Sequence, residues 1–276
     1  MKNILKIVVC IKQVPLVSEL PWDSQTGTLQ RNLSEGMINP ACKHALEAAL
    51  RLKQKHGGHI VVLTMGPPMA KEVLYEAQAM GADSGILLTD KAMAGADTFI
   101  TSYTLAKAII KKCPDFDLVL CGCSTSDSET AHVGPQLAEE LKVPGVANAH
   151  DLKLSGKTLR VKRLSDNFLE TLEMDLPGLV TITTQEFLPR YVPMQGIQKA
   201  FDEANIISLN AYELGLDAEK IGTKGSPTRI LNVYPPTAKK TNIILRGSPE
   251  KIVEELFYRF DDKIGGAIGK DLKTDE

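Results

Sequence analysis

The feature that most constrains the fold is a regular alternation in the first half of the chain. Short runs that are almost entirely hydrophobic alternate with longer stretches whose hydrophobic residues recur at helical spacing. Such runs are typical of strands covered on both faces, as in a parallel sheet between two layers of helices. The alternation therefore predicts a doubly wound α/β domain with a mostly parallel sheet. The hydrophobic runs are 7–11, 60–63, 86–88 and 118–121.

The stretches between these runs have the spacing of helices with one buried side. The clearest lies before Pro114, which is expected to end it. Its face is formed by Phe99, Ile100, Tyr103, Ala106, Ile109 and Ile110. The other expected helices are marked by Ala45–Leu50, by Met69–Ala77 and, after Thr130, by Val133–Leu141.

The pattern changes after about Pro144. Residues 151–154 and 158–161 flank Ser155-Gly156-Lys157, which predicts a hairpin turn. Residues 171–176 alternate strictly between hydrophobic and polar, and 179–183 supply another strand. We expect these strands to extend the same sheet as antiparallel members.

The last part of the chain has fewer core residues. From Pro189 onward it is rich in proline and glycine, yet one stretch near the end has an apolar stripe at helical spacing. The stripe is formed by Ile252, Val253, Leu256, Phe257 and Phe260. This helix is interpreted as part of an extended C-terminal arm that docks elsewhere, and packing against its own domain remains open.

Composition excludes several classes of function. A formal net charge of −2 and 5% aromatic residues give no basis for a nucleic-acid surface. No run approaches the ~18 apolar residues of a membrane span, and the start of the chain lacks a secretion signal. The chain is therefore predicted to be cytoplasmic and not inserted in a membrane. The five cysteines form no disulfide framework, and Cys121-Gly122-Cys123 has neither redox nor zinc spacing, so no metal site is expected.

Ligands of open α/β sheets bind beyond the carboxyl ends of the strands. There the chain places Cys10, Ile11 and Lys12 after the first strand, Thr64–Pro68 after the second and Gly122–Gly134 after the fourth. In the last stretch, small residues allow close approach, and Asp127, Ser128 or Thr130 can cap the next helix. It is neither a Walker A loop nor a GxGxxG fingerprint. By pattern alone it is either a phosphate cradle or a capped helix start.

No hydrolytic or acid–base group of residues is expected to act. Of the histidines, only His132 falls in this region, and the neighbouring Ser126 and Asp127 do not have the spacing of a catalytic triad. A site rich in backbone donors and poor in acid–base groups suits a protein whose cofactor carries the reactivity.

Several segments, in order along the chain, resemble beta subunits of electron-transferring flavoproteins. They include Val9-Cys10-Ile11-Lys12-Gln13-Val14-Pro15 near the start and Pro189-Arg190-Tyr191 leading to Gly196-Ile197-Gln198-Lys199-Ala200, similar to a partner-recognition loop. The other similar segments are 38–40, 64–67, 79–83, 96–98, 130–139 and 169–181.

The resemblance implies an adenine nucleotide at this edge of the sheet. Electron-carrying members hold AMP there, whereas bifurcating members hold FAD, which takes a hydride from NADH. Thr130–Pro135 and Asp23…Thr26-Gly27-Thr28-Leu29 are more similar to the bifurcating group. The chain departs from the family at Asp127-Ser128-Glu129, at His132 where glutamine is usual, and at Ser165–Phe168 where relatives carry Asp-Gly-Gly.

The resemblance also implies roles for residues. Cys10, Asn39 and Met65 would surround the adenine, the Gly122–Gly134 loop would hold phosphates, and His132 would stand near the flavin or nicotinamide. No residue is expected to be catalytic. The full set of expected cofactor-binding residues is Cys10, Lys12, Asn39, Met65, Gly66, Gly122, Cys123, Ser124, Asp127, Ser128, Glu129, Thr130, Ala131, His132, Val133 and Gly134.

The implied partners follow from the same resemblance. Residues 1–190 would form the nucleotide-binding domain, and 191–276 a partner-recognition loop and an arm that docks on an alpha subunit. Electrons from NADH would pass to ferredoxin and, through the alpha-subunit flavin, to an acyl-CoA or hydroxy-acid dehydrogenase. The alternatives are an electron shuttle that holds structural AMP and docks through 189–200, and a free-standing nucleotide-binding domain.

Overall fold

The computed structural model describes residues 4–16, 22–23, 28–29, 36–229, 231 and 243–271. The chain divides into two compact units, Met1–Val233 and Tyr234–Glu276. Within the motif Asp23…Leu29, Thr26 and Gly27 lie outside the described residues, so its similarity to the bifurcating group stays a sequence prediction.

The first unit is built on a nine-stranded sheet with the order β11-β10-β9-β12-β8-β1-β6-β7-β13. The seven strands β9-β12-β8-β1-β6-β7-β13 all run parallel to one another in the sheet. Strand β10 is antiparallel to both β9 and β11. The predicted mostly parallel sheet with antiparallel additions is therefore confirmed. The strands are β1 (Lys6–Cys10), β6 (His59–Met65), β7 (Ser84–Leu88), β8 (Leu118–Gly122), β9 (Gly145–Ser155), β10 (Thr158–Ser165), β11 (Phe168–Asp175), β12 (Gly178–Ile182) and β13 (Ile206–Leu209).

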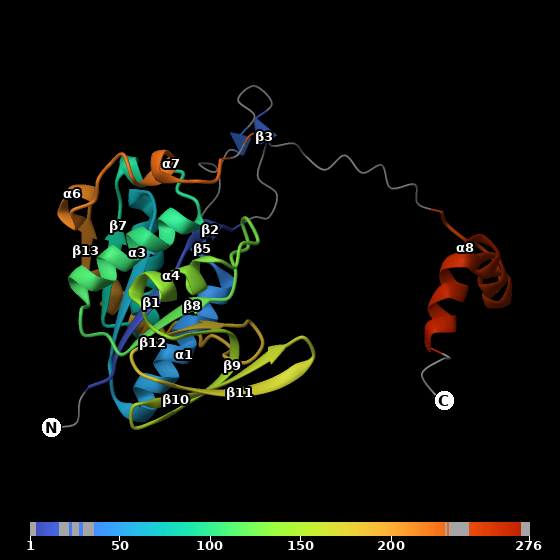
Figure 1. Ribbon diagram of the computed structural model, residues 1–276, viewed down its shortest axis with the longest axis horizontal. Helices are drawn as coiled ribbons and strands as arrows, with labels where there is room; N and C mark the ends of the chain where they lie inside the picture. Colours follow the sequence, from blue (N-terminus) through green and yellow to red (C-terminus); the bar gives the residue numbers. More distant parts are fainter. Residues whose placement is uncertain are drawn as a thin grey trace. The chain divides into compact units, whose positions relative to one another are not determined.

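Helices cover both faces of the sheet (Figure 1). Side chains alternate between the faces along a strand, so Ile7 and Val9 of β1 join one hydrophobic cluster and Val8 and Cys10 the other. The first cluster contains buried residues of α1 (Pro40–His56) and α2 (Lys71–Met80), and the second those of α3 (Thr98–Lys112) and α4 (Val133–Leu141). This is the doubly wound arrangement that the alternation predicts.

Short elements connect these layers. A small antiparallel ribbon of β2 (Gln13–Pro15) and β5 (Gly36–Ile38) precedes α1, and β3 (Trp22–Asp23) pairs with β4 (Thr28–Leu29). Two short 3-10 helices, Pro68–Ala70 and Lys91–Met93, precede α2 and α3.

The strands after Pro144 confirm the predicted hairpin but correct one expectation. Strands β9 and β10 pair around the turn that contains Gly156. Strand β12, expected to be antiparallel, runs parallel to both β8 and β9 and lies between them. All of its residues are buried, as expected for a strand inside a sheet that is covered on both faces.

The turn between β10 and β11 contains two residues in the left-handed region. Asp166 and Asn167 both have positive φ, 47° and 68°. Asp and Asn are the non-glycine residues that most readily adopt this region. The tight hairpin therefore forms without a glycine at either position.

Residues beyond 190 also belong to the first unit. Helix α5 (Met194–Asp202) packs on α2, and β13 pairs with β7. The short helices α6 (Ala211–Leu214) and α7 (Gly222–Gly225) follow, and Leu214 and Ile221 are buried in the cluster on the α3 face. The expected boundary at residue 190 thus lies inside this unit. Strand β13 was not predicted because it lies at the edge of the sheet, where two of its four residues are exposed. Its hydrophobic run is therefore too short to recognise in the sequence.

The second unit contains the predicted amphipathic helix, α8 (Pro249–Asp271), which has non-helical backbone angles at Phe260. Its apolar residues Val253, Leu256 and Phe257 are exposed. The docking of this helix on a partner stays a prediction. No helix within the described residues is long and apolar enough to cross a membrane.

The place of β13 in the core gives a stability prediction. Leu209 is buried at the end of β13, whereas Ile207 on the same strand is exposed. We expect Leu209→Ala to lower the free energy of unfolding by about 2–5 kcal/mol because it leaves a cavity. Ile207→Ala, the matched control, should change it by less than about 1 kcal/mol. Urea unfolding of the two variants checks this, and equal effects would show that β13 does not contribute to the core.

Candidate functional site

The expected site residues come together where the strand order reverses. The chain proceeds from β1 to β6 and β7 on one side, and then returns to place β8 on the other side of β1. Cys10 and Cys121 are register partners at the carboxyl ends of these two strands. Ligands of open α/β sheets bind at such a switch point. The loops after β1 and β8 therefore form the candidate site.

Asn39, at the start of α1, holds the loop after β8. Its backbone N–H donates to the carbonyl of Lys12 at 2.8 Å. Its side-chain Nδ2 donates to the carbonyl of Ser124 at 2.8 Å, and its Oδ1 accepts from the backbone N–H of Ser126 at 3.0 Å. Through its backbone and its side chain, this buried residue thus joins the end of β1, the start of α1 and the loop after β8, which are distant in the sequence. The structure gives Asn39 a loop-positioning role, which the sequence did not predict.

A charged pair ties the same loop to the end of β1. Lys12 Nζ lies 2.7 Å from Asp127 Oδ1, which also accepts from Thr125 Oγ1 at 2.7 Å. The Asp127 side chain is 12% exposed and that of Lys12 43%. The ammonium therefore offsets the negative charge inside the loop while part of it still faces solvent.

The start of α4 corrects the predicted capping. His132 occupies the N-cap position with helical angles, φ −88° and ψ −27°, and its side chain makes no capping hydrogen bond. Asp127 bonds to Lys12 and Thr125 instead, because the loop turns back at Glu129 (φ 50°), whose N–H donates to the carbonyl of Thr125. The N-cap side chain thus leaves the N–H groups of Val133 and Gly134 in the first turn of α4 uncapped, an arrangement that suits an anion.

Two glycines allow the helices to approach the strands closely. A Cβ on Gly122 would lie 2.7 Å from the backbone of both Ala41 and Cys42 in α1. A Cβ on Gly134 would collide with Cγ2 of Thr181 in β12. Because only glycine fits at such approaches, both residues serve to place the N-terminal turns of α1 and α4 at the sheet edge.

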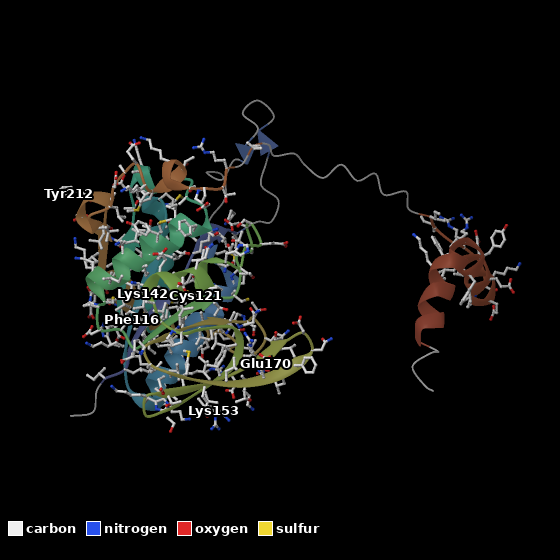
Figure 2. The ribbon with its side chains drawn as sticks, viewed as in Figure 1. Phe116, Cys121, Lys142, Lys153, Glu170 and Tyr212 are labelled. Carbon is white, nitrogen blue, oxygen red and sulfur yellow. The ribbon has the colours of Figure 1, made fainter. Side chains whose placement is uncertain are left out.

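Buried thiols lie beneath the loop. Cys10, Cys42 and Cys121 are buried, and Figure 2 places Cys121 in the sheet beside α4. Burial raises the pKa of the Cys42 thiol, and a hydrogen bond with Cys10 together with burial raises that of Cys121. Neutral thiols behave as small apolar groups, so they provide packing rather than chemistry. Cys121 is the small buried residue expected at the strand end, while Cys123 is partly exposed.

Other expected residues lie further along the edge. Met65 ends β6 and packs against the cluster that contains Cys10. Gly66 follows it, and its N–H donates to the carbonyl of Leu88 at 3.0 Å. Since β6 and β8 flank β1 on opposite sides, these two residues lie across β1 from the loop.

The sequence missed three contributors to the site. Thr125 and Ser126 bond to Asp127 and Asn39, and Thr181 sets the position of Gly134. The first two lie inside the stretch that the sequence singled out. Thr181 is on β12, and no local pattern connects it to the site.

The arrangement is suited to binding an anion rather than to acid–base catalysis. Its donors are backbone N–H groups of the loop and of α4, small hydroxyl side chains, and the partly exposed ammonium of Lys12. The remaining expected residues of the loop, Ser124, Ser128, Glu129, Ala131 and His132, are exposed, and Thr130 and Val133 are partly so. A phosphate-bearing ligand therefore fits the donor set.

The role of Asn39 generates a prediction. Asn39→Ala removes both side-chain bonds to the loop, so we expect a loss of about 1–3 kcal/mol in unfolding free energy. Affinity for AMP or FAD should fall about tenfold or more because the loop loses its fixed shape. Titration calorimetry on the cofactor-depleted protein measures this affinity.

The matched control is Asn210→Ala, which removes the cap of α6 away from the site. It should cost about 1 kcal/mol of stability and leave nucleotide affinity unchanged. Unchanged affinity in Asn39→Ala would contradict the positioning role.

The thiols give a second prediction. At pH 8, iodoacetamide should modify Cys123 first, while Cys42 and Cys121 react only on unfolding, since a raised pKa and burial reduce their accessible thiolate. Peptide mass spectrometry over time reads the order. Rapid modification of Cys42 in the folded protein would contradict the buried arrangement.

Comparison with known proteins agrees with this geometry. The electron transfer flavoprotein domain matches residues 26–212. The electron transfer flavoprotein subunit beta of Thermoanaerobacterium thermosaccharolyticum is 39% identical over 94% of this chain and 99% of its own. The caffeyl-CoA reductase-Etf complex subunit CarD of Acetobacterium woodii is 41% identical, covering 88% and 93% of the two chains. The acryloyl-CoA reductase electron transfer subunit gamma of Anaerotignum propionicum is 37% identical, covering 94% and 99%.

The match extends over most of the chain and includes every strand of the nine-stranded sheet except β1, together with the loop after β8 and helix α4. The chain therefore belongs to the electron transfer flavoprotein family, among its beta subunits.

Proposed function

We propose that this beta subunit binds FAD at the switch point and takes part in NADH-dependent electron bifurcation. The observation that carries the proposal is the start of α4, where the His132 side chain makes no capping bond, beside a loop whose shape is fixed by Asn39 and Asp127. A dinucleotide needs backbone donors for its diphosphate and an apolar surface for its adenine. The names of two relatives, which place them with acyl-CoA reductases, support this function.

Each element of the site has a distinct task in the proposal. The N–H groups from Gly122 to Gly134 and the ammonium of Lys12 would hold the phosphates, and Cys10 and Met65 would lie against the adenine. Asn39 would keep the loop in place rather than contact the ligand through its bonded amide. His132, exposed at the N-cap of α4, would be free to stand near the ring system. The chemistry that FAD supplies is acceptance of a hydride from NADH and transfer of its electrons one at a time.

The proposed partners follow from the same role. As a beta subunit the chain has an alpha-subunit partner, and we assign α8, with its exposed apolar stripe, to that contact. One electron would go to ferredoxin and one through the alpha-subunit flavin to an acyl-CoA or hydroxy-acid dehydrogenase. A cytoplasmic location remains a prediction.

The segment that would dock the dehydrogenase is exposed and apolar. Tyr191 is 99% exposed and Met194 79%, with Leu188 and Phe201 on either side. Large apolar side chains that are exposed together mark interaction surfaces. We assign residues 188–201, called the docking segment below, to this contact.

The alternative is an electron shuttle subunit that holds AMP. Asp127 and Glu129 in the loop oppose the phosphate charge of either ligand, because the monophosphate of AMP and the diphosphate of FAD each carry about two negative charges at neutral pH. The ion pair with Lys12 reduces this effect for Asp127. The two ligands therefore differ in the number of phosphate groups to be bound rather than in phosphate charge.

Cofactor content distinguishes the two functions. Co-expressed with its alpha subunit and extracted under denaturing conditions, the heterodimer should release two flavins and no AMP. Anaerobic mixing with NADH should then reduce flavin rapidly. One flavin with one AMP, and no rapid reduction, would establish the shuttle instead. The matched variant His132→Gln should leave the cofactor content unchanged and report separately on any role of His132 in the flavin potentials.

A further inference from the structure

We infer that Glu47 and Arg190 are positioning residues that hold the docking segment in the shape in which it meets its partner. The inference rests on the proposed docking function of residues 188–201. It concerns a buried ion pair away from the nucleotide edge, between helix α1 and the base of this exposed segment.

Glu47 is buried on α1 and accepts several hydrogen bonds. Its carboxylate receives Arg190 Nε at 2.8 Å, Arg190 Nη2 at 3.2 Å and the backbone N–H of Arg190 at 3.3 Å. Arg51, one turn along α1, donates through Nε at 3.0 Å. The Glu47 side chain is only 5% exposed, so both oxygens are satisfied by arginine rather than by water.

The energetics of this pair make it a specific anchor. Burial by itself raises the pKa of the Glu47 carboxyl, but hydrogen bonds from Arg190 and Arg51, together with the charge of Arg190, hold that pKa below its ordinary value. A buried carboxylate is costly unless it is paired and hydrogen-bonded. Any movement of Arg190 away from α1 would leave this charge with a single arginine. The segment is thereby held at Arg190.

Further contacts hold the segment just before and well after Arg190. Phe187 is buried, and the guanidinium of Arg51 lies 5.6 Å from the centre of its ring. Downstream, a Cβ on Gly196 would collide with the carbonyl oxygen of Ala79, so α5 lies directly on α2. Phe201 stacks on Tyr75 with ring centres 5.2 Å apart.

Between these anchors, the side chains that face solvent are apolar. Leu188, Tyr191 and Met194 contribute little to the core, because all are strongly exposed. Their backbone, in contrast, is tied down on both sides. Fixing a loop in its bound shape reduces the entropy lost on association. A docking surface requires a fixed backbone beneath its exposed apolar side chains. Glu47 contributes to this by binding Arg190 and thereby fixing the backbone of the docking segment.

The test uses the co-expressed heterodimer with Glu47→Gln and, separately, Arg190→Lys. Glutamine keeps the size of Glu47 but removes its charge, and lysine keeps the charge of Arg190 but not its two-pronged geometry. Glu173→Gln is the matched control, since Glu173 forms an exposed pair with Arg160 on the hairpin. The probe is the caffeyl-CoA reductase component of the Acetobacterium woodii complex, used as electron acceptor.

Hydrogen exchange in peptides covering 188–199 should become about tenfold faster in both variants and remain unchanged in the control. The KM for the reductase should rise about five- to tenfold while kcat changes less than about twofold, because docking is affected and electron delivery is not. Flavin reduction by NADH should stay as in the wild type. A merely structural role would lower stability without this division between KM and kcat.

The outcomes separate the inference from the proposed function. Wild-type exchange in both variants overturns the positioning role. Faster exchange with an unchanged KM, while the wild type transfers electrons to the reductase, also overturns it. A wild-type heterodimer that transfers no electrons to the reductase counts against the docking function, and the exchange data then decide by themselves whether the pair holds the segment.

Discussion

The structure depends on one neighbour relation, the pairing of β1 with β8 in the middle of the sheet. This pairing reverses the strand order and brings Cys10 beside Cys121, so that two loops far apart in the sequence meet at one edge. Gly122 then lets α1 approach the end of β8. This approach brings Asn39 to the loop, and the pairing of β1 with β8 brings Lys12 there. The site is therefore a consequence of strand order combined with a glycine at the strand end.

Helix α1 connects the two functional surfaces. Asn39 at its start holds the nucleotide loop, and Glu47, eight residues further, holds the docking segment. Eight residues of helix correspond to about 12 Å. Both contacts are made by buried polar groups whose partners lie far along the chain, at residues 124–126 and 190. The same rigid element thus sets the shape of the proposed cofactor site and of the proposed partner surface.

The sequence predicted the layers and the edge of the site because those depend on local patterns. Runs such as 118–121 have no polar residue, and the stretch from Gly122 to Gly134 follows such a run directly. The parallel direction of β12 and the membership of β13 depend on long-range pairing, which hydrophobic patterns do not encode. The same holds for Asn39, whose partners lie about 85 residues away, and for the pair of Glu47 with Arg190. The capping prediction failed for a long-range reason as well, since Asp127 bonds to Lys12, which lies 115 residues earlier in the chain.

The central claim is that the loop from Gly122 to Gly134 holds the phosphates of FAD. The most direct measurement is an experimental structure of the assembled heterodimer with its native cofactors. We expect FAD at the carboxyl ends of β1 and β8, with its diphosphate on the N-terminal turn of α4 and its adenine against Cys10 and Met65. AMP at this edge would contradict the bifurcating function while keeping the nucleotide site. An adenine nucleotide bound elsewhere on the chain would contradict both the bifurcating function and a nucleotide site at the switch point.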